Sequence, residues 1–346
     1  MKTSLNWHQR LSLLIGVCVM VGGTGLLAVR MSAAADDLSL GDLPLEHVAD
    51  VPLPGRTTRL DYESYDPNRH LLFIVHLGDG EVLVFDAGTS RVVARISDVS
   101  SVHGVLAIPE LGRVYASATG TNEIVAIDET TLKIVARMPG GRYPDGMAYA
   151  PEVNKLYVSD ETGDTETVID VRTNQRVATI PLGGEVGNTQ YDPRSRHVFV
   201  NVQTRNELVE IDPKADRVVG RFPLAGARQN HGLLIDPNGH LAFIACEGND
   251  KLLTFDLDSK RVIQSFDVGS DPDVLAFDTA SKSLYVAGEA GIVSMFSLTN
   301  IGVRKIGEGR LGSNAHVVAV DSISHRSYFP LKNVGGRPVL RVMQAR

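Results

Sequence analysis

Cysteine and tryptophan are almost absent from this chain of 346 residues, which has two cysteines, Cys18 and Cys246, and one tryptophan, Trp7. Residues 1–35 have the pattern of a removable targeting segment, as argued below, so Cys246 alone would remain and no intrachain disulfide could form. Trp7 would leave with the same segment, and with it the strongest stacking platform for nucleic-acid bases. Stability must therefore come from packing rather than from covalent links.

Local motifs of catalysis and cofactor binding are missing as well. The sequence contains no Gly-x-Ser-x-Gly elbow, phosphate-binding loop, Cys-x-x-Cys-His haem site or dinucleotide fingerprint. The glycine-rich run at residues 183–187 leads into a predicted strand, so it offers no helix N-terminus to a phosphate. No segment after residue 35 has a convincing helical period, which points to an all-β chain.

Basic residues are outnumbered. The chain has 34 Lys and Arg against 41 Asp and Glu, a formal net charge of −7. Residues 1–35 contain Lys2, Arg10 and Arg30 and no acidic residue, so the rest of the chain carries −10. Proteins bind nucleic acid without sequence preference by neutralising phosphates with Lys and Arg, so this balance argues against nucleic acid as a partner.

Only one long apolar run occurs, the 19 residues from Leu11 to Val29. It follows Lys2 and Arg10 and precedes Ser32-Ala33-Ala34-Ala35, an Ala-x-Ala cleavage pattern. This order predicts a signal peptide at 1–35, bacterial export to the periplasm or medium, and no membrane span after cleavage. The alternative is an uncleaved anchor, because a run of this length can just cross a bilayer.

A turn recurs at nearly constant spacing through the rest of the chain. Its central position is occupied in order by Pro67, Pro109, Pro151, Pro193, Pro237, Thr279 and Ser322, which are 42, 42, 42, 44, 42 and 43 residues apart. Short apolar runs of period two lie between these turns. A period in the low forties built of short strands is typical of β-propeller blades.

The first complete unit shows the four strands expected of a blade, over residues 60–65, 70–76, 81–86 and 91–96. The last unit supplies three strands, over 317–321, 326–330 and 339–343, and its missing fourth strand is assigned to residues 45–52. We therefore predict an all-β, seven-bladed β-propeller with four antiparallel strands per blade, whose last blade is closed by the N-terminal strand. Residues 36–44 form a linker, residues 45–346 a single domain, and we expect a monomer.

The strand sequences resemble a known family. Leu156-Tyr157-Val158-Ser159, Val198-Phe199-Val200-Asn201 and Leu284-Tyr285-Val286-Ala287 look like the second-strand motif of the YVTN-repeat bacterial β-propellers. The hairpins Ile127–Val135 and Ile211–Val219 match the next hairpin of that family. The architecture is also similar to virginiamycin B lyase-like and lactone-hydrolysing propellers. The resemblance implies a propeller but assigns no activity.

One position of the repeat points to function. It lies six residues before each turn, at the entry to the innermost strand, and we call it the mouth position. Its occupants in order are Asp61, His103, Asp145, Gly187, His231, Asp273 and His316. Innermost strands surround the central channel of a propeller, so these side chains are expected to meet at one mouth of that channel. Asn188 could replace the side chain that Gly187 lacks.

Loop tips favour polar residues, which accounts for the aspartates but not for three of the ten histidines at one position. Imidazole and carboxylate groups are the usual ligands of Zn, Fe, Mn or Cu, so Asp61, His103, Asp145, His231, Asp273 and His316 are candidate ligands of a divalent metal ion. The same groups can move protons, with His231 or His316 as acid or base and Asp273 between them as the orienting carboxylate.

Other residues in the same loops are candidates for holding a ligand, namely Arg59, Arg142, Arg228, Asn188, Asn230 and Asn314. Arginine would clamp a carboxylate or phosphate, whereas a solvated loop arginine is the plain alternative. The loops between second and third strands add His76, Asp160, Glu161, Glu247 and Glu289, which suggest an acidic rim. Cys246 is expected to be buried and inert.

Three functions remain open from these residues. The first is an exported propeller that binds a small ligand at the mouth, with a divalent metal ion. The second is a metal-assisted lyase or lactone hydrolase at the same mouth. The third is a scaffold that docks a protein partner in the cell envelope.

Overall fold

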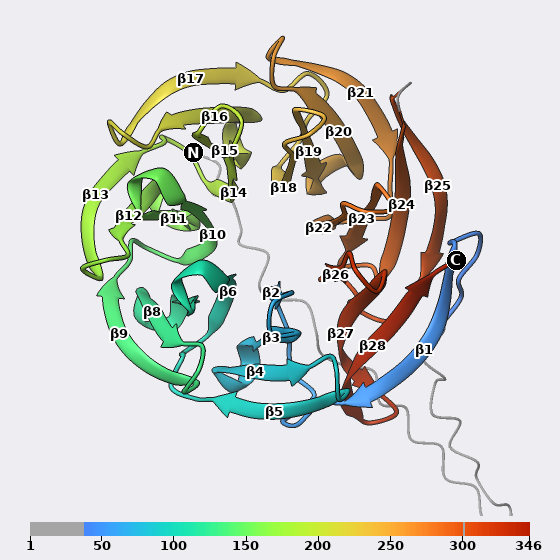
Figure 1. Cartoon of the computed structure of the whole chain (residues 1–346). Coiled ribbons are helices and arrows are strands. Elements are labelled where there is room, and N and C mark those ends of the chain that lie inside the picture. The colour runs from blue at the N-terminus through green and yellow to red at the C-terminus, as the bar shows by residue number, and fades with distance from the viewer. Residues whose placement is uncertain (1–37, 300–301) are drawn as a thin grey trace, which may run out of the picture. The chain divides into compact units, whose positions relative to one another are not determined.

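The structure is a computed structural model and describes residues 38–299 and 302–346. Seven four-stranded antiparallel sheets follow one another around a ring (Figure 1), which confirms the predicted seven-bladed propeller. The predicted signal peptide at 1–35 lies outside the described residues. Among the residues described, no helix is long and apolar enough to cross a membrane.

Blades 1 to 3 are consecutive in the chain, and each runs from its innermost to its outermost strand. Blade 1 consists of β2 (Glu63–Asp66), β3 (Leu71–His76), β4 (Glu81–Asp86) and β5 (Arg91–Ile96). Blade 2 consists of β6 (Val102–Ile108), β7 (Arg113–Ala118), β8 (Glu123–Asp128) and β9 (Lys133–Pro139). Blade 3 consists of β10 (Pro144–Ala150), β11 (Lys155–Asp160), β12 (Thr165–Asp170) and β13 (Gln175–Pro181).

Blades 4 to 6 repeat the pattern. Blade 4 consists of β14 (Val186–Asp192), β15 (His197–Val202), β16 (Glu207–Asp212) and β17 (Arg217–Pro223). Blade 5 consists of β18 (Asn230–Asp236), β19 (Leu241–Cys246), β20 (Lys251–Asp256) and β21 (Arg261–Asp267). Blade 6 consists of β22 (Pro272–Asp278), β23 (Ser283–Gly288), β24 (Ile292–Thr299) and β25 (Gly302–Arg310).

Blade 7 joins the two ends of the described part of the chain. It consists of β26 (Ala319–Asp321), β27 (Arg326–Val334), β28 (Arg337–Ala345) and β1 (Leu45–Pro52), and β1 pairs antiparallel with β28. In Figure 1 the blue β1 lies beside the red β28. The predicted closing strand is thus confirmed. Arg341, 3% exposed, donates from Nε and Nη2 to the two carboxylate oxygens of Asp50, at 2.8 and 2.7 Å.

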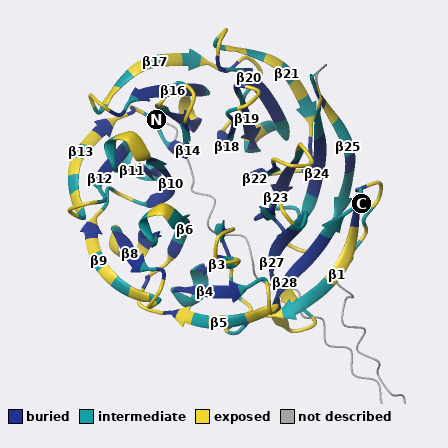
Figure 2. Ribbon diagram, viewed as in Figure 1, coloured by how far each residue is buried: buried dark blue, intermediate teal, exposed yellow. Residues whose placement is uncertain are grey.

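The apolar core lies between neighbouring sheets. Phe73 and Val84 of blade 1 pack in one cluster with Val114 and Val125 of blade 2, for example. The middle strands are buried on both faces, whereas the outermost strands alternate between exposed and half-buried residues (Figure 2). Alternation of this kind is expected where one face of a strand packs on a core and the other meets solvent.

The described part of the predicted linker, residues 38–44, lies against the sheet of blade 6. Ser39 forms an isolated bridge with Arg310, and Asp42 accepts a hydrogen bond from the amide of Glu308 at 2.8 Å. Leu43 is 3% exposed and belongs to the core cluster of blades 6 and 7. These residues therefore cover part of β25 instead of running free.

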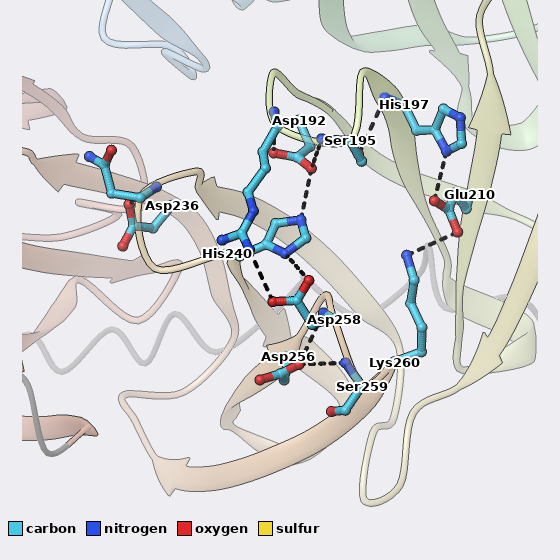
Figure 3. A network of polar contacts seen from close by, with 12 residues as sticks. Asp192, Ser195, His197, Glu210, Asp236, His240, Asp256, Asp258, Ser259 and Lys260 are labelled. Atoms are coloured by element: carbon cyan, nitrogen blue, oxygen red, sulfur yellow. Dashed lines mark hydrogen bonds and ion pairs between the residues drawn. The ribbon is translucent and has the colours of Figure 1, made fainter.

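A polar network joins blades 4 and 5 at the ends of their innermost strands (Figure 3). The imidazole of His240 lies between two carboxylates, with Nε2 3.1 Å from Asp192 Oδ2 and Nδ1 2.8 Å from Asp258 Oδ1. Asp192 also accepts hydrogen bonds from the amides of Arg194 and Ser195 in its own turn. The turn chemistry of one blade is thereby connected to a side chain of the next.

Candidate functional site

The mouth positions coincide with an irregularity in the innermost strands. Strand pairing is interrupted between Val102 and Val105 in blade 2, and at the matching place in blades 3, 4, 5 and 6. His103, Asp145, Gly187, His231 and Asp273 lie within these bulges. A bulge turns a side chain away from the regular pleat, so these residues are freed from the sheet pattern to face the mouth.

Glycines after the mouth residues bring neighbouring blades together. A Cβ on Gly104 would lie 2.1 Å from the carbonyl oxygen of Asp145, and one on Gly232 would lie 2.0 Å from that of Asp273. Such distances are far below contact, so these positions accept only glycine without a shift of the backbone. The backbones of consecutive mouth residues therefore touch, and this contact fixes their spacing.

His231, Glu247 and Asp273 form a first cluster. One ligand atom of each lies within 4.8 Å of the others, and His231 Nε2 is 3.5 Å from Asp273 Oδ1. The side chains of His231 and Asp273 are buried, and Asp273 Oδ1 has no hydrogen-bond partner among the described residues. Glu247 follows β19 and was expected only on the rim.

His316, Asp273 and Glu289 form a second cluster, so Asp273 belongs to both. His316 Nε2 is 3.7 Å from Asp61 Oδ1, 3.9 Å from Asp273 Oδ2 and 3.8 Å from Glu289 Oε1, and it has no hydrogen-bond partner within the described part of the chain. Arg59 lies on the same cluster, with Nε 3.1 Å from Asp61 Oδ2 and Nη1 2.6 Å from Glu289 Oε1.

Burial and the crowding of carboxylates raise several pKa values at the mouth. Burial and neighbouring carboxylates raise the pKa of each of Asp145, Glu161 and Glu247 to about 7. Burial alone would lower the pKa of His231, but Glu247, Asp273 and other nearby carboxylates outweigh it and raise that pKa to about 9. The mouth therefore carries more negative charge than its own groups neutralise, which favours a cationic ligand.

Tyr62 is a further residue that contacts the mouth, and it was not predicted. Its hydroxyl donates to Asn188 Oδ1 at 2.6 Å and lies 3.1 Å from His231 Nε2, so one side chain of blade 1 reaches residues of blades 4 and 5. Tyr62 also lines a cavity of about 150 Å³ formed by the innermost strands. The sequence signal available was its place directly after Asp61.

His103 and Asp145 lie at the mouth but outside the two clusters. The ring of His103 is held by the Tyr143 hydroxyl, 2.9 Å from Nε2, and by the carbonyl of Ser101, 2.8 Å from Nδ1. Asp145 is 4% exposed, and its Oδ1 has no hydrogen-bond partner in the described region. Of the six candidate metal ligands, His231, Asp273 and His316 are thus brought into the clusters, with Asp61 beside His316.

The candidate ligand-holding residues divide into two groups. Arg59 and Asn188 take part in the mouth, as described, and Asn314 accepts a hydrogen bond from His316 Nδ1 at 3.0 Å and bonds to Glu289 through its amide. Asn230 is buried between blades 5 and 4, where it donates to Asn201 and to the carbonyl of Glu207.

Arg142 and Arg228 are exposed, and Arg142 donates to the carbonyl of Thr162 in a neighbouring loop. Asp160 accepts bonds from Gly141, Thr165 and Thr167 within blade 3, so it holds a loop. Cys246 is buried, and burial raises the pKa of its thiol to about 12, as expected for an inert cysteine.

Comparisons with known proteins show the fold alone. No family model and no curated protein matches the chain. A structure of Kuenenia stuttgartiensis hydrazine synthase is 13% identical with a TM-score of 0.70, covering 90% of this chain and 98% of that one. The WD40 repeats of RRP9 are 11% identical, with a TM-score of 0.74 over 87% of this chain and all of that one. A structure of U3-55K is 11% identical with a TM-score of 0.73, covering 85% of this chain and 98% of that one.

Proposed function

We propose that the mouth of this propeller binds a small ligand together with a divalent metal ion held by His231, Glu247 and Asp273. The observation that carries the proposal is one imidazole and two carboxylates within 4.8 Å of one another, in a buried and negatively charged site. Two further observations support it. Asp273 Oδ1 is buried without a hydrogen-bond partner among the described residues, and the pKa of Glu247 is raised to about 7, a strain that a bound cation would relieve.

The neighbouring cluster fits a metal ion less well. Arg59 already places a positive charge between Asp61 and Glu289, beside His316. No arginine is paired with His231, Glu247 or Asp273 in the described ion pairs. An imidazole with two carboxylates suits Zn²⁺, Mn²⁺ or Fe²⁺ and leaves coordination positions for water or a ligand.

The same arrangement indicates where the small ligand would lie. Arg59 and His316 offer donors on one side of Asp273, while the hydroxyl of Tyr62 donates its proton to Asn188 and lies 3.1 Å from His231 Nε2. A ligand with a carboxylate or carbonyl oxygen would satisfy both the metal ion and these donors. The predicted export and the resemblance to YVTN-repeat propellers make the periplasm or the medium the proposed place of action.

A catalytic role at this mouth is the second candidate. His316 Nε2 is buried, faces three carboxylates and lacks a hydrogen-bond partner within the described residues, so this atom is free to exchange a proton with a bound molecule. With a metal ion polarising a carbonyl group, His316 would act as acid or base, as in a lyase or lactone hydrolase.

Calorimetric titration with Mn²⁺ and Zn²⁺ tests the proposal on purified, chelator-treated protein. We expect a site whose affinity falls about 100-fold or more in His231→Gln and in Asp273→Asn, beyond the 10- to 100-fold typical of residues that only orient ligands. Glu46→Gln, on an exposed part of β1, is the matched control. Equal affinities in all four proteins would refute the metal site and leave the scaffold as the remaining function.

Turnover separates binding from catalysis. Lactones and cyclic esters would be incubated with wild-type protein and with His316→Ala. Turnover that is lost in the variant while metal affinity is retained would establish the catalytic function. Metal binding with no turnover in either protein would leave ligand binding as the function.

A further inference from the structure

A further buried histidine, His76, lies outside the mouth clusters. His76 ends β3, and its side chain is fully buried. The hydroxyl of Thr58 has one proton, which it donates to Asp79 Oδ1 at 3.2 Å, so toward His76 Nε2, 3.0 Å away, it acts as the acceptor. This chain of hydrogen bonds assigns the proton to Nε2 and leaves the lone pair on Nδ1.

That lone pair faces two carboxylates. His76 Nδ1 is 3.7 Å from Asp79 Oδ2 and 3.8 Å from Glu81 Oε1, and it has no hydrogen-bond partner among the described residues. Ligand atoms of the three residues lie within 4.8 Å of one another. Three groups that offer only lone pairs repel one another unless a cation lies between them. The distances also leave space for an ion, since metal–nitrogen and metal–oxygen bonds are about 2.0–2.2 Å.

Gly55 keeps this space open. Its φ of +104° lies in the region that favours glycine, and a Cβ there would lie 2.5 Å from Asp79 Oδ2 and 2.8 Å from His76 Nδ1. Any other residue would therefore place a carbon atom against both donor atoms. The amide of the next residue, Arg56, donates to Asp79 Oδ2 at 2.9 Å and fixes the carboxylate in this position.

The equivalent positions in blades 2 and 4 show which residues of this site belong to the general repeat and which are particular to blade 1. A glutamate also begins the third strand in blades 2 and 4, where Glu123 pairs with Arg137 and Glu207 with Arg221, as Glu81 does with Arg95. The glutamate–arginine pair thus belongs to the repeat. The place of His76 is taken by alanine in blade 2 and valine in blade 4, and that of Asp79 by threonine and arginine. The histidine and the aspartate are additions of blade 1.

Two arginines partly balance the carboxylates of this site. Arg56 bonds to Asp79 and Arg95 to Glu81, but their side chains are 71% and 50% exposed. Solvent screens the exposed guanidinium groups, whereas the side chains of Asp79 and Glu81 are only 10% and 3% exposed. Arg95 Nη2 donates to Glu81 Oε1 at 2.8 Å, and the amide of Arg56 donates to Asp79 Oδ2 at 2.9 Å. The two oxygens nearest His76 Nδ1 therefore each accept one hydrogen bond and keep a further lone pair for a cation.

We propose that His76, Asp79 and Glu81 form a second divalent metal site in blade 1, separate from the mouth and selective for Zn²⁺ or Mn²⁺ class ions. Thr58 is its positioning residue, since it orients both His76 and Asp79. One nitrogen and two oxygen donors leave the coordination shell incomplete, so water or an external ligand would complete it.

Titration in a background without the mouth site tests this proposal. Chelator-treated Asp273→Asn protein would be titrated with Zn²⁺ and with Mn²⁺ by calorimetry. We expect Asp273→Asn protein to bind one metal ion, at the blade 1 site. Adding His76→Gln or Asp79→Asn to this protein should lower the affinity of that site about 100-fold or more. Glu123→Gln in the same background, which removes the matching glutamate of blade 2, should leave the affinity unchanged. The mouth site is tested by comparing wild type with Asp273→Asn, and the blade 1 site by comparing Asp273→Asn with the double variants. Each proposal can therefore fail without the other.

A measurement on the wild-type protein guards against variants that do not fold. Long-range proton–nitrogen spectra of the histidine rings should show His76 with its proton on Nε2 in the metal-free protein, and a shift of the Nδ1 resonance on adding Zn²⁺. A proton on Nδ1, or an Nδ1 resonance that Zn²⁺ leaves unchanged, would overturn the proposal. So would equal affinities in the His76 and Glu123 variants.

Discussion

Replacing Glu247 by glutamine should stabilise the metal-free protein at alkaline pH. Burial, together with Asp273 and Glu161, raises the pKa of Glu247 to about 7 from an ordinary value of 4.5. A carboxyl group with a raised folded-state pKa contributes stability that is complete below pH 4.5 and is lost as the pH rises through 7. At about 1.4 kcal/mol for each unit, the loss reaches about 3 kcal/mol. Glutamine is never ionised, so the variant escapes this loss.

The gain in the variant is smaller than the full loss, because Glu247 also attracts the imidazolium of His231. We therefore expect Glu247→Gln to exceed wild type by up to about 3 kcal/mol at pH 8, or about 6 °C in Tm, and by much less at pH 4.5. Thermal unfolding, monitored by circular dichroism in the presence of chelator, measures the Tm of each protein at both pH values. With Zn²⁺ present the order should reverse, since the variant lacks a ligand.

Glu46→Gln is the control, because Glu46 is exposed on β1. If Glu247→Gln lowers Tm at pH 8 in chelator, or changes it equally at both pH values, then the carboxyl group of Glu247 is not strained by its neighbours. The electrostatic argument for a cation at the mouth would then fail.

Three further substitutions test the packing. Asp50→Asn should cost about 3 kcal/mol in urea unfolding, because Arg341 would stay buried without its carboxylate; an unchanged midpoint would contradict this. Gly232→Ala should lower the free energy of unfolding by about 1–3 kcal/mol or more and weaken metal binding, because the added carbon would lie 2.0 Å from the carbonyl oxygen of Asp273 in the next blade. A variant whose Tm equals that of wild type would contradict the close contact between these two blades. His240→Gln should cost about 1–3 kcal/mol at pH 7, since Asp192 loses a buried partner, and chemical unfolding that matches wild type would speak against the network.

Much of the fold could be predicted because the turn repeats in the chain itself. The aspartates that end third strands were expected to bind turn amides, and Asp86 Oδ1 accepts from Gly88 and Thr89 at 2.8 and 3.1 Å. The entries of the innermost strands were less predictable. The strand expected at 60–65 is β2, Glu63–Asp66, because the chain before it follows the irregular backbone of the mouth rather than the pleat.

Only those parts of the candidate site that follow from position in the repeat could be predicted from the sequence. Position in the repeat identified His231, Asp273 and His316, since equivalent positions must surround one channel. Register could not show that Arg59 turns toward Asp61 and Glu289, because arginine directions are set by the charges it meets in the folded ring. It also could not show the reach of Tyr62 to Asn188, a contact across 126 residues of chain.

Closure of the ring by β1 and β28 has a kinetic consequence. Six blades are built from hairpins of adjacent strands, which form rapidly, whereas the Asp50–Arg341 contact joins residues 291 positions apart. Contacts of such separation require most of the backbone to be ordered first, so closure should be the slow step of folding. Until it occurs, blades 1 and 7 are not held side by side, and Arg59 and His316 cannot share their carboxylates. A nascent chain would therefore acquire a complete mouth only after its last strand is synthesised.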